Sequence, residues 1–419
     1  MIPTRFQLIS VFCFSLNALV ADSTPPTSAD AELAAVRQKT AEVLRMLGDK
    51  AGIPEAPDKY QAVPKSARWL TAAEAQAAFA KANPKLEQLR WWKPRLDPAT
   101  LAHTLREPAA VIAGCVAAHR AGLDDAERSL AIAKEAAEFL IWAQSEAGTG
   151  VFPFPSARGV KGNKAFTAAD NYFAKAEREG RLGEVMHKGW AIDDAGNGGL
   201  QFDNAEAGVA MLELYEATHD AKCLDSARKA ADWAAARPIV ENWNYNSFSV
   251  HLLAKVFAVT HERKYLDAAT RKALVGVIPG QLTDGPRIGR WLDAHNAKPE
   301  YHYIMMRGLA QLIAVMPKDD PARVEIVRSL RLGLHARNAD FTGPGVSNKN
   351  SAIDALLTVK NVFATDSDFL RDTLTDEALD ALGKLVSGQY LRGNGPLGPR
   401  EWGLFLEHVK LKRGEPASR

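Results

Sequence analysis

A helix-turn-helix pattern that repeats at an offset of 42 residues constrains the fold of this chain more than any other feature. The segment from Thr218 to Ala227 reappears, with changed side chains but the same pattern, from Thr260 to Ala269. Units of this length are helix pairs that bury their apolar faces only against neighbouring pairs. The repeat therefore predicts an array of helical hairpins.

Apolar residues recur at helical spacing almost everywhere after residue 30, and runs with strand alternation are scarce. Two sequences fit a capping box, Thr71 to Glu74 and Asp203 to Glu206. A short β-hairpin is expected between Glu184 and Phe202, around a turn at 195–199. The expected helices are 31–48, 71–82, 98–121, 125–146, 165–178, 204–217, 221–236, 247–259, 263–276, 299–315, 320–336, 350–363 and 369–388.

From residue 204 onward, turns of about three residues join the two helices of a pair, and longer loops lead to the next pair. Short turns and long loops must then lie at opposite ends of the bundle. We expect an all-α fold, an (α/α) toroid of five to six hairpins with first helices inside and second helices outside. A straight solenoid of helix pairs is compatible with the same period.

The first 21 residues read as a signal peptide, in which Arg5 precedes an apolar stretch from Leu8 to Val20. We expect residues 22–30 to be a disordered leader and 31–419 to be one toroid domain. The mature protein is then periplasmic or extracellular, and no later segment is apolar enough for a membrane span. A net charge of +2 gives no basis for nucleic-acid binding. Cys115 and Cys223 are expected to be free.

The long loops share a composition rich in Asn, Arg, Gly and aromatic residues. A sugar ring presents an apolar face edged by donors and acceptors, so its site needs flat aromatics beside polar groups. Tryptophan occurs once per structural unit in these loops, although such residues also commonly cover the ends of a helical core. The substrate-binding candidates are Trp190, Trp243, Arg287, Arg290, Trp291, His295 and Asn296.

The densest polar cluster enters the helix that begins at Pro299 and contains His302, Tyr303 and Arg307. A second cluster, one unit earlier, contains Asn244 and His251. Histidine can act as a base, tyrosine as an acid, and Arg or Asn can hold an anionic group. The alternative is that these are satisfied interior residues of an inner helix.

Two histidines belong to the repeat itself. His219 and His261 occupy equivalent short turns and are assigned to structure, because repeats encode packing.

Paired carboxylates are the usual machinery of glycoside hydrolysis. The candidate acids at the long-loop end are Asp193, Asp194, Asp293 and Glu300, whereas Asp203 and Glu206 are attributed to helix capping. The sequence contains no zinc-binding helix, nucleophile elbow, P-loop or dinucleotide fingerprint. We therefore predict no metal and no cofactor.

The chain resembles the α/α-toroid carbohydrate-active proteins, a group that includes six-hairpin glycoside hydrolases, sugar epimerases and toroidal polysaccharide lyases. The resemblance rests on repeats such as Leu212–Thr218 and Tyr265–Ala269 and covers most of the chain after residue 98. In toroidal lyases it implies that Asn with Arg or His neutralises a uronate carboxylate, while Tyr or His moves the adjacent proton. Residues of those types are Asn244, His251, His302, Tyr303 and Arg307.

Three functions follow for a protein whose expected partner is a poly- or oligosaccharide. The first is a lyase that cleaves uronic-acid-containing glycans by β-elimination. The second is a glycoside hydrolase that uses two of the four candidate acids. The third is a non-catalytic glycan-binding protein that depends on the three loop tryptophans.

Overall fold

The computed structural model describes residues 59–92, 96–123, 126–194, 198–292, 298–394 and 397–412. The expected signal peptide, the leader and the helix expected at 31–48 lie outside these ranges. Asp293, His295 and Asn296 also lie outside them.

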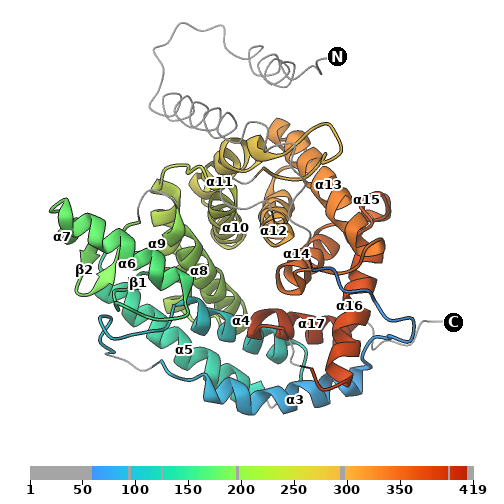
Figure 1. Cartoon of the computed structure of the whole chain (residues 1–419), viewed down its shortest axis with the longest axis horizontal. Helices are drawn as coiled ribbons and strands as arrows, with labels where there is room; N and C mark the ends of the chain where they lie inside the picture. Colours follow the sequence, from blue (N-terminus) through green and yellow to red (C-terminus); the bar gives the residue numbers. More distant parts are fainter. Residues whose placement is uncertain are drawn as a thin grey trace, which may run out of the picture.

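Within this part of the chain, six helices form a closed inner ring (Figure 1). Each packs against the next, and the last packs against the first, so the fold is an (α/α) toroid rather than a solenoid. The predicted fold class is thereby confirmed. The inner helices are α4 (Arg106–Arg120), α8 (Gly199–Thr218), α10 (Trp243–Thr260), α12 (Pro299–Val315), α14 (Lys349–Val362) and α17 (Pro399–Lys412).

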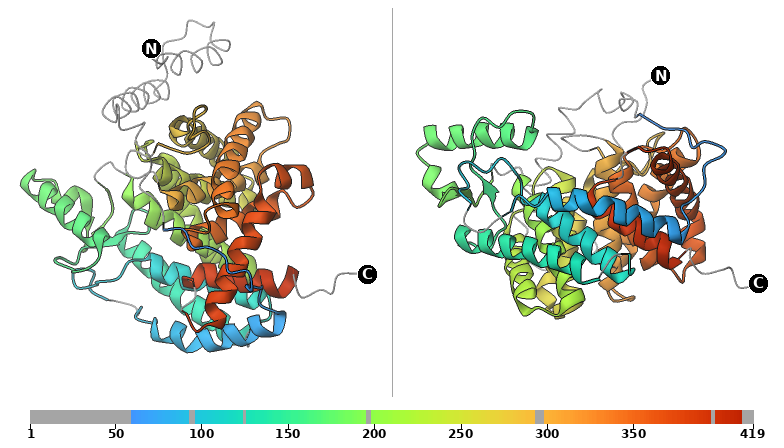
Figure 2. Two further views of the ribbon diagram at one scale, coloured as in Figure 1. Left: turned by 45° about the vertical axis from the view of Figure 1, so that its right-hand side comes forward. Right: turned by 90° about the horizontal axis from the view of Figure 1, so that it is seen from below.

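A second layer of helices covers the outside of the ring, each packed on its inner partner (Figure 2). Short turns follow the carboxyl ends of α4, α8, α10 and α12, and longer connections return from the outer helices to the next inner one. The outer helices are α3 (Ala72–Gln88), α5 (Ala126–Ala147), α9 (Ala221–Ala236), α11 (Arg263–Gly276), α13 (Pro321–Thr342) and α16 (Thr375–Leu391). Two short elements, η3 (Ile278–Gly280) and α15 (Ser367–Asp372), lie in the connections.

The repeated turn has the same geometry in both copies. His219 and His261 end α8 and α10 in the left-handed region, each with φ of 56°. Their backbone N–H groups bond to the carbonyl oxygens of Tyr215 and Phe257, and each imidazole meets the same aromatic ring edge-on. This is a helix C-cap, so the structural assignment of both histidines is confirmed.

Helix α17 has no counterpart among the helices expected from sequence. Trp402, Phe405, Leu406 and Val409 are nevertheless buried at helical spacing. With α3 from the other end of the chain, α17 makes the sixth hairpin and closes the ring on α4. The approach is close, because a Cβ added to Gly403 would lie 2.6 Å from the Cα atom of Gly114.

Substitution of Gly114 by alanine is expected to destabilise the protein by about 2 kcal/mol. The new Cβ would lie 2.3 Å from the carbonyl oxygen of Pro399, and a backbone atom cannot rotate away. Chemical denaturation of the full chain measures the loss. Gly183→Ala is the matched control, since no atom lies within 4 Å of its added Cβ. Equal stability of the two variants would contradict the tight α4–α17 crossing.

Several helix boundaries differ from the predicted ones. Helix α4 begins at Arg106 rather than at 98, because Asp97 and Thr100 close a separate turn. Helix α8 begins at Gly199, so Asp203 and Glu206 lie inside it and do not form a capping box. The other box is confirmed: the N–H of Glu74 bonds to the Thr71 hydroxyl at 3.1 Å, and the N–H of Thr71 bonds to the Glu74 carboxylate at 2.8 Å. The helix expected at 369–388 is divided between α15 and α16.

Residues 151–192 form an arm that projects from the ring (Figures 1 and 2). It contains α6 (Lys164–Arg178), α7 (Leu182–Val185) and a sheet of β1 (Phe154–Pro155), β3 (Trp190–Ala191) and β2 (Met186–His187) in that order. The expected hairpin exists, but its turn is Lys188–Gly189, with φ of 47° and 77°, rather than 195–199. A separate apolar cluster that includes Val151, Phe166 and Phe173 holds most of the arm together.

Both Cys115 and Cys223 are buried and free, as expected. Over the described ranges, none of the helices combines the length and hydrophobicity that a membrane span requires.

Candidate functional site

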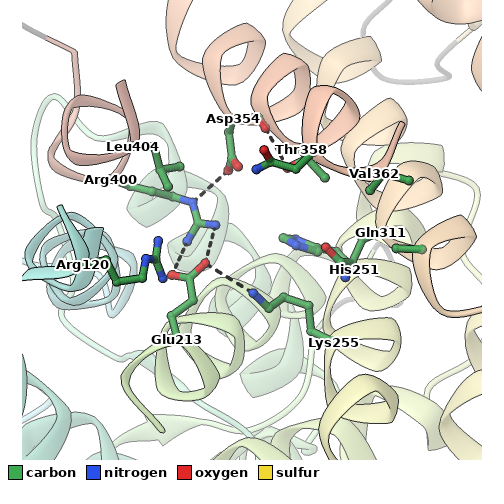
Figure 3. A pocket seen from close by; sticks show the side chains of 12 residues that line it. Arg120, Glu213, His251, Lys255, Gln311, Asp354, Thr358, Val362, Arg400 and Leu404 are labelled. Carbon is green, nitrogen blue, oxygen red and sulfur yellow. Dashed lines mark hydrogen bonds and ion pairs between the residues drawn. The ribbon is translucent and has the colours of Figure 1, made fainter. Parts of the chain in front are cut away.

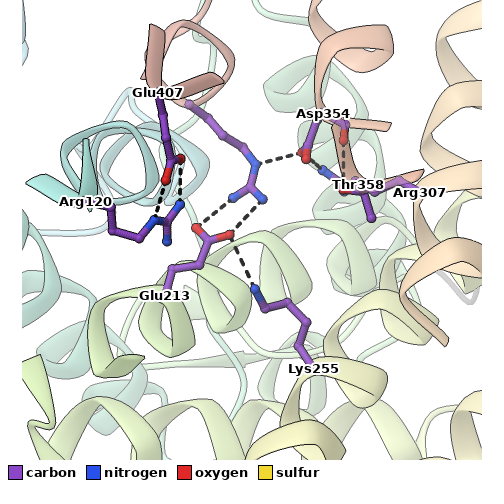
Figure 4. A network of polar contacts seen from close by, with 8 residues as sticks. Arg120, Glu213, Lys255, Arg307, Asp354, Thr358 and Glu407 are labelled. Atoms are coloured by element: carbon purple, nitrogen blue, oxygen red, sulfur yellow. Dashed lines mark hydrogen bonds and ion pairs between the residues drawn. The ribbon is translucent and has the colours of Figure 1, made fainter. Parts of the chain in front are cut away.

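Six side chains of alternating charge cross the centre of the ring, and we call them the central charge chain; Figure 4 labels Glu213, Lys255, Arg307 and Asp354 among them. Arg307 bonds to Glu206 and to Asp354, at 2.5 Å in each case. Arg400 bonds to Asp354 at 2.8 Å and to Glu213 at 3.1 Å. Lys255 ends the chain, with its Nζ 3.7 Å from the Glu213 carboxylate. Five different inner helices are thereby linked.

Burial explains why these charges must be paired. The side chains of Arg400 and Asp354 are only 5% and 6% exposed, and an unpaired charge at such depth is costly. Burial opposes the ionisation of Asp354, but Arg400 and Arg307 outweigh it and hold its pKa well below the ordinary value. The pKa of Glu213 is likewise lowered, because Arg400 and Lys255 outweigh its burial. Both carboxylates therefore stay ionised and cannot donate a proton.

A cavity of about 340 Å³ adjoins this chain, lined mainly by the carboxyl halves of α4, α8, α10, α12 and α14 and by the amino half of α17 (Figure 3). Charged groups and neutral hydrogen-bonding groups both reach its wall, which suits a hydroxyl-rich ligand that also carries a charge. Its polar lining consists of Arg120, Glu213, His251, Lys255, Gln311, Asp354, Thr358, Asn361 and Arg400. The cavity lies on the short-turn side of the ring, whereas the sequence directed attention to the long-loop side.

His251 lies on this cavity wall and is 4% exposed. Burial lowers its pKa well below 6.5, and the neighbouring positive charge of Arg307 lowers it further. Its imidazole is therefore neutral at neutral pH. Among the described residues, none forms a hydrogen bond with either ring nitrogen. A neutral imidazole with an available lone pair is the form that a general base requires.

His302 has the opposite environment. Its Nε2 lies 3.1 Å from the carbonyl oxygen of Trp291, and its Nδ1 accepts a hydrogen bond from Arg337 at 2.7 Å. Tyr303 donates its hydroxyl proton to Asn338 at 3.0 Å, and burial raises its pKa well above 10. Both side chains are completely buried. They are satisfied interior residues, so the expectation that they act at the site needs correction.

The five residues expected to converge are therefore divided. His251 and Arg307 lie at the centre of the ring, whereas His302 and Tyr303 contact the loop and helix outside α12. Tyr303 and Arg307 share a helix face, but the Tyr303 hydroxyl meets α13 while the longer arginine reaches across the ring. Asn244 is fully buried in the first turn of α10.

The three loop tryptophans are buried too, at 1% for Trp190, 2% for Trp243 and 0% for Trp291. Trp243 donates its indole N–H to the carbonyl oxygen of Leu292 at 2.7 Å, and Trp291 donates to that of Val277 at 2.9 Å. None of the three indole rings therefore has an exposed face on which a sugar ring could stack. Their role here is to fill the space beneath the loops, and the predicted stacking platform is not present.

The remaining candidates are dispersed around the long-loop end. Asp193 pairs with Arg237, while Asp194 accepts the N–H of Leu200 at 3.2 Å. Glu300 is exposed in the first turn of α12. Arg290 bonds to Asp340 at 2.9 Å, and Arg287 is half-buried. Of the expected acids that the structure describes, none lines the cavity.

Sequence reasoning missed most of the central charge chain. Glu213 and Asp354 are single acidic residues within apolar stretches, Met-Leu-Glu-Leu-Tyr and Ala-Ile-Asp-Ala-Leu. A charge inside an apolar helical segment is the signal that would have found them, because such charges are buried only when paired. Glu206 was instead assigned to a capping box.

Glu401 is a further carboxyl group near the chain, in the first turn of α17. Burial raises its pKa, and the negative charges of Asp354 and Glu206 raise it further. Glu401 therefore retains a proton more easily than Asp354 or Glu213, whose pKa values are lowered.

No protein-family model and no curated protein sequence matches this chain. Solved structures do match the fold of this chain. A polysaccharide lyase aligns over 82% of this chain and 99% of its own, with a TM-score of 0.51 and 14% identity. An unsaturated glucuronyl hydrolase mutant from Streptococcus agalactiae, complexed with dGlcA-GalNAc6S, aligns over 87% and 98%, with a TM-score of 0.50 and 12% identity. At such identities the similarity demonstrates a common α/α-toroid fold.

Proposed function

We propose that this protein is a carbohydrate-active enzyme that cleaves a uronic-acid-containing glycan by β-elimination. The observation that carries the proposal is the neutral, unengaged imidazole of His251 on the wall of a cavity that also contains Lys255 and Arg120. The two toroids described above, a polysaccharide lyase and a glucuronyl hydrolase, are consistent with this class of substrate.

The cations would hold the uronate carboxylate. Lys255 is the most suitable, because its 3.7 Å contact with Glu213 is the longest in the central charge chain. Arg120 lines the same cavity and is held at 2.8 Å by Glu407. Neutralising the carboxylate makes the adjacent C5 proton more acidic, since the negative charge that develops in the transition state is stabilised.

His251 would then remove the C5 proton. The electron pair of the C5–H bond forms the C4=C5 double bond while the C4–O bond breaks. The imidazolium returns the proton to the leaving glycosidic oxygen, which restores neutral His251. The reaction consumes no water and no redox equivalent.

Incubation with alginate, pectin and glycosaminoglycans tests the proposal. The expected product carries an unsaturated uronate, which is detected by its ultraviolet absorbance and by mass spectrometry. Absence of unsaturated ends from every acidic glycan in the panel would refute the β-elimination reaction.

The pH profile should reflect the burial of His251. Because burial and the charges of Arg307, Arg400 and Lys255 lower its pKa, against the opposing effect of Asp354, the base stays unprotonated well below pH 6.5. We expect kcat/KM to remain level as the pH falls through 6.5 and to decline only at lower pH. Initial rates in buffers of constant ionic strength measure this. An acid limb centred at or above pH 6.5 would contradict His251 as the base.

A second candidate function is glycoside hydrolysis, and it is favoured by Glu401. A carboxyl group with a raised pKa can act as a general acid, and Glu206 is one of two carboxylates, with Asp354, that act on Glu401 electrostatically. The hydrolase would release new reducing ends without unsaturation. Glu401→Gln should then abolish release, while Glu300→Gln, at an exposed position, should not.

Export by the N-terminal signal peptide and independence from metals and cofactors are also part of the proposal. Fractionation of cells that express the full chain tests the first. Activity that survives dialysis against a chelator is the expected result for the second.

A further inference from the structure

Helix α6 of the arm exposes a polar stripe along its whole length. Lys164, Thr167, Asn171, Lys175 and Arg178 are all exposed and follow one another at steps of three or four residues. Residues at these steps lie on one face of a helix. The opposite face is buried through Phe166, Phe173 and Ala176. We call the five exposed residues the α6 stripe.

The stripe is positively charged in a protein that is nearly neutral. Three of its five residues are cations, and none is acidic. The segment from Arg158 to Lys188 holds seven basic and four acidic residues, a net charge of +3. The whole chain carries +2, so the rest of it is slightly negative. Positive charge is therefore concentrated on the arm.

Within the described structure, Glu179 is the carboxylate that acts on the cations at the carboxyl end of the stripe, Lys175 and Arg178. Lys164 and Arg178 form no ion pair with any described residue within 4.0 Å. Lys175 lies 3.9 Å from Glu179, but Arg181 holds that carboxylate more closely, at 2.6 Å. The stripe thus retains positive charge that an external anion can use.

The ring does not need the stripe. The buried face of α6 packs on the apolar cluster of the arm, and the ring is closed by contacts among the inner helices. Figure 2 shows α6, in green, projecting from the body of the molecule. A substitution on the stripe should therefore leave the toroid folded.

We propose that the α6 stripe is a docking surface for an acidic polysaccharide, separate from the cavity. Its cations extend from residue 164 to residue 178, which is about 21 Å along a helix. A polymer with repeated carboxylates or sulfates can contact all three at once, whereas a single small anion can contact only one. Thr167 and Asn171, between the cations, can hydrogen-bond to hydroxyl groups. The choice of a glycan as the polyanion rests on the proposed function.

Affinity electrophoresis of the full chain tests this surface. Gels would contain alginate, polygalacturonate or neutral dextran. The variant Lys164→Gln/Lys175→Gln/Arg178→Gln removes three charges and retains good helix formers. We expect its affinity for the acidic polymers to fall by about tenfold, since each exposed charge contact contributes modestly. Dextran should retard neither protein, and added salt should weaken the wild-type interaction.

The matched control removes three exposed charges elsewhere, as Lys222→Gln/Lys318→Gln/Arg371→Gln. It should bind the acidic gels as the wild type does. Equal weakening in both triple variants would mean that only net charge matters, and would overturn the proposal, as would no weakening in the α6 variant. Thermal melts establish that both variants are folded.

Retardation in the gel does not require cleavage, so the docking surface and the lyase activity can be refuted independently of each other. Binding that depends on the stripe, without any unsaturated product, would refute the lyase and retain the docking surface. Formation of unsaturated product, together with equal retardation of the wild type and the α6 variant in acidic gels, would refute the docking surface and retain the lyase.

Discussion

Replacement of His251 by glutamine is expected to lower kcat by at least about a hundredfold on the glycan that the wild type cleaves. Glutamine keeps hydrogen-bonding atoms near the cavity but cannot accept the C5 proton. His251 has no described hydrogen-bond partner to lose, so the fold should survive the change. Initial rates of unsaturated-product formation, with circular dichroism to check folding, measure the effect.

His302→Gln is the matched control for a buried histidine on the neighbouring inner helix. Both nitrogens of His302 are engaged, by Trp291 and Arg337, so this variant should lose stability. At a temperature where it remains folded, its kcat should stay near the wild-type value. The reverse pattern, with activity lost in His302→Gln and kept in His251→Gln, would move the chemistry to the long-loop side.

The architecture could be predicted because it depends on local pattern. The repeated turns at His219 and His261 encode the alternation of short and long connections, and this alternation alone indicates paired helices in two layers. Closure of the ring was harder to foresee. It depends on α17, whose apolar spacing is clear, and on the close approach of Gly114 to Gly403, which are far apart in the sequence.

The site could be predicted only in part, because its contacts join distant residues. The partner of Arg307 is Glu206, 101 residues earlier, and the partner of Arg400 is Glu213, 187 residues earlier. Local rules assigned Glu206 to a cap, although a longer α8 places it inside the helix. The exposure predicted for the loop tryptophans was wrong for a related reason. A polar loop sequence indicates exposure, but the loops fold back over their aromatic rings.

Replacement of Arg400 by methionine is expected to cost about 3–5 kcal/mol of unfolding free energy at neutral pH. Its guanidinium bonds to Asp354 through Nε and to Glu213 through both terminal nitrogens. Methionine fills much of the same volume without a charge, so two buried carboxylates lose a shared cation. Urea denaturation of the full chain measures the loss.

The control and the pH dependence together identify the cause. Arg328→Met removes a half-buried guanidinium that pairs with Glu325, and pairs this accessible to water contribute at most about 1 kcal/mol. In the wild type the pKa values of Asp354 and Glu213 are lowered, so their ionised forms stabilise the fold above the unfolded-state pKa, and this stability is lost as the pH falls. Without Arg400 these pKa values rise, and the two carboxyl groups can take up protons in mild acid. The deficit of Arg400→Met should therefore be largest at neutral pH and shrink towards pH values of about 4, near the ordinary carboxyl pKa. A loss of unfolding free energy that does not change with pH would indicate that the variant is destabilised by lost packing rather than by unpaired charge.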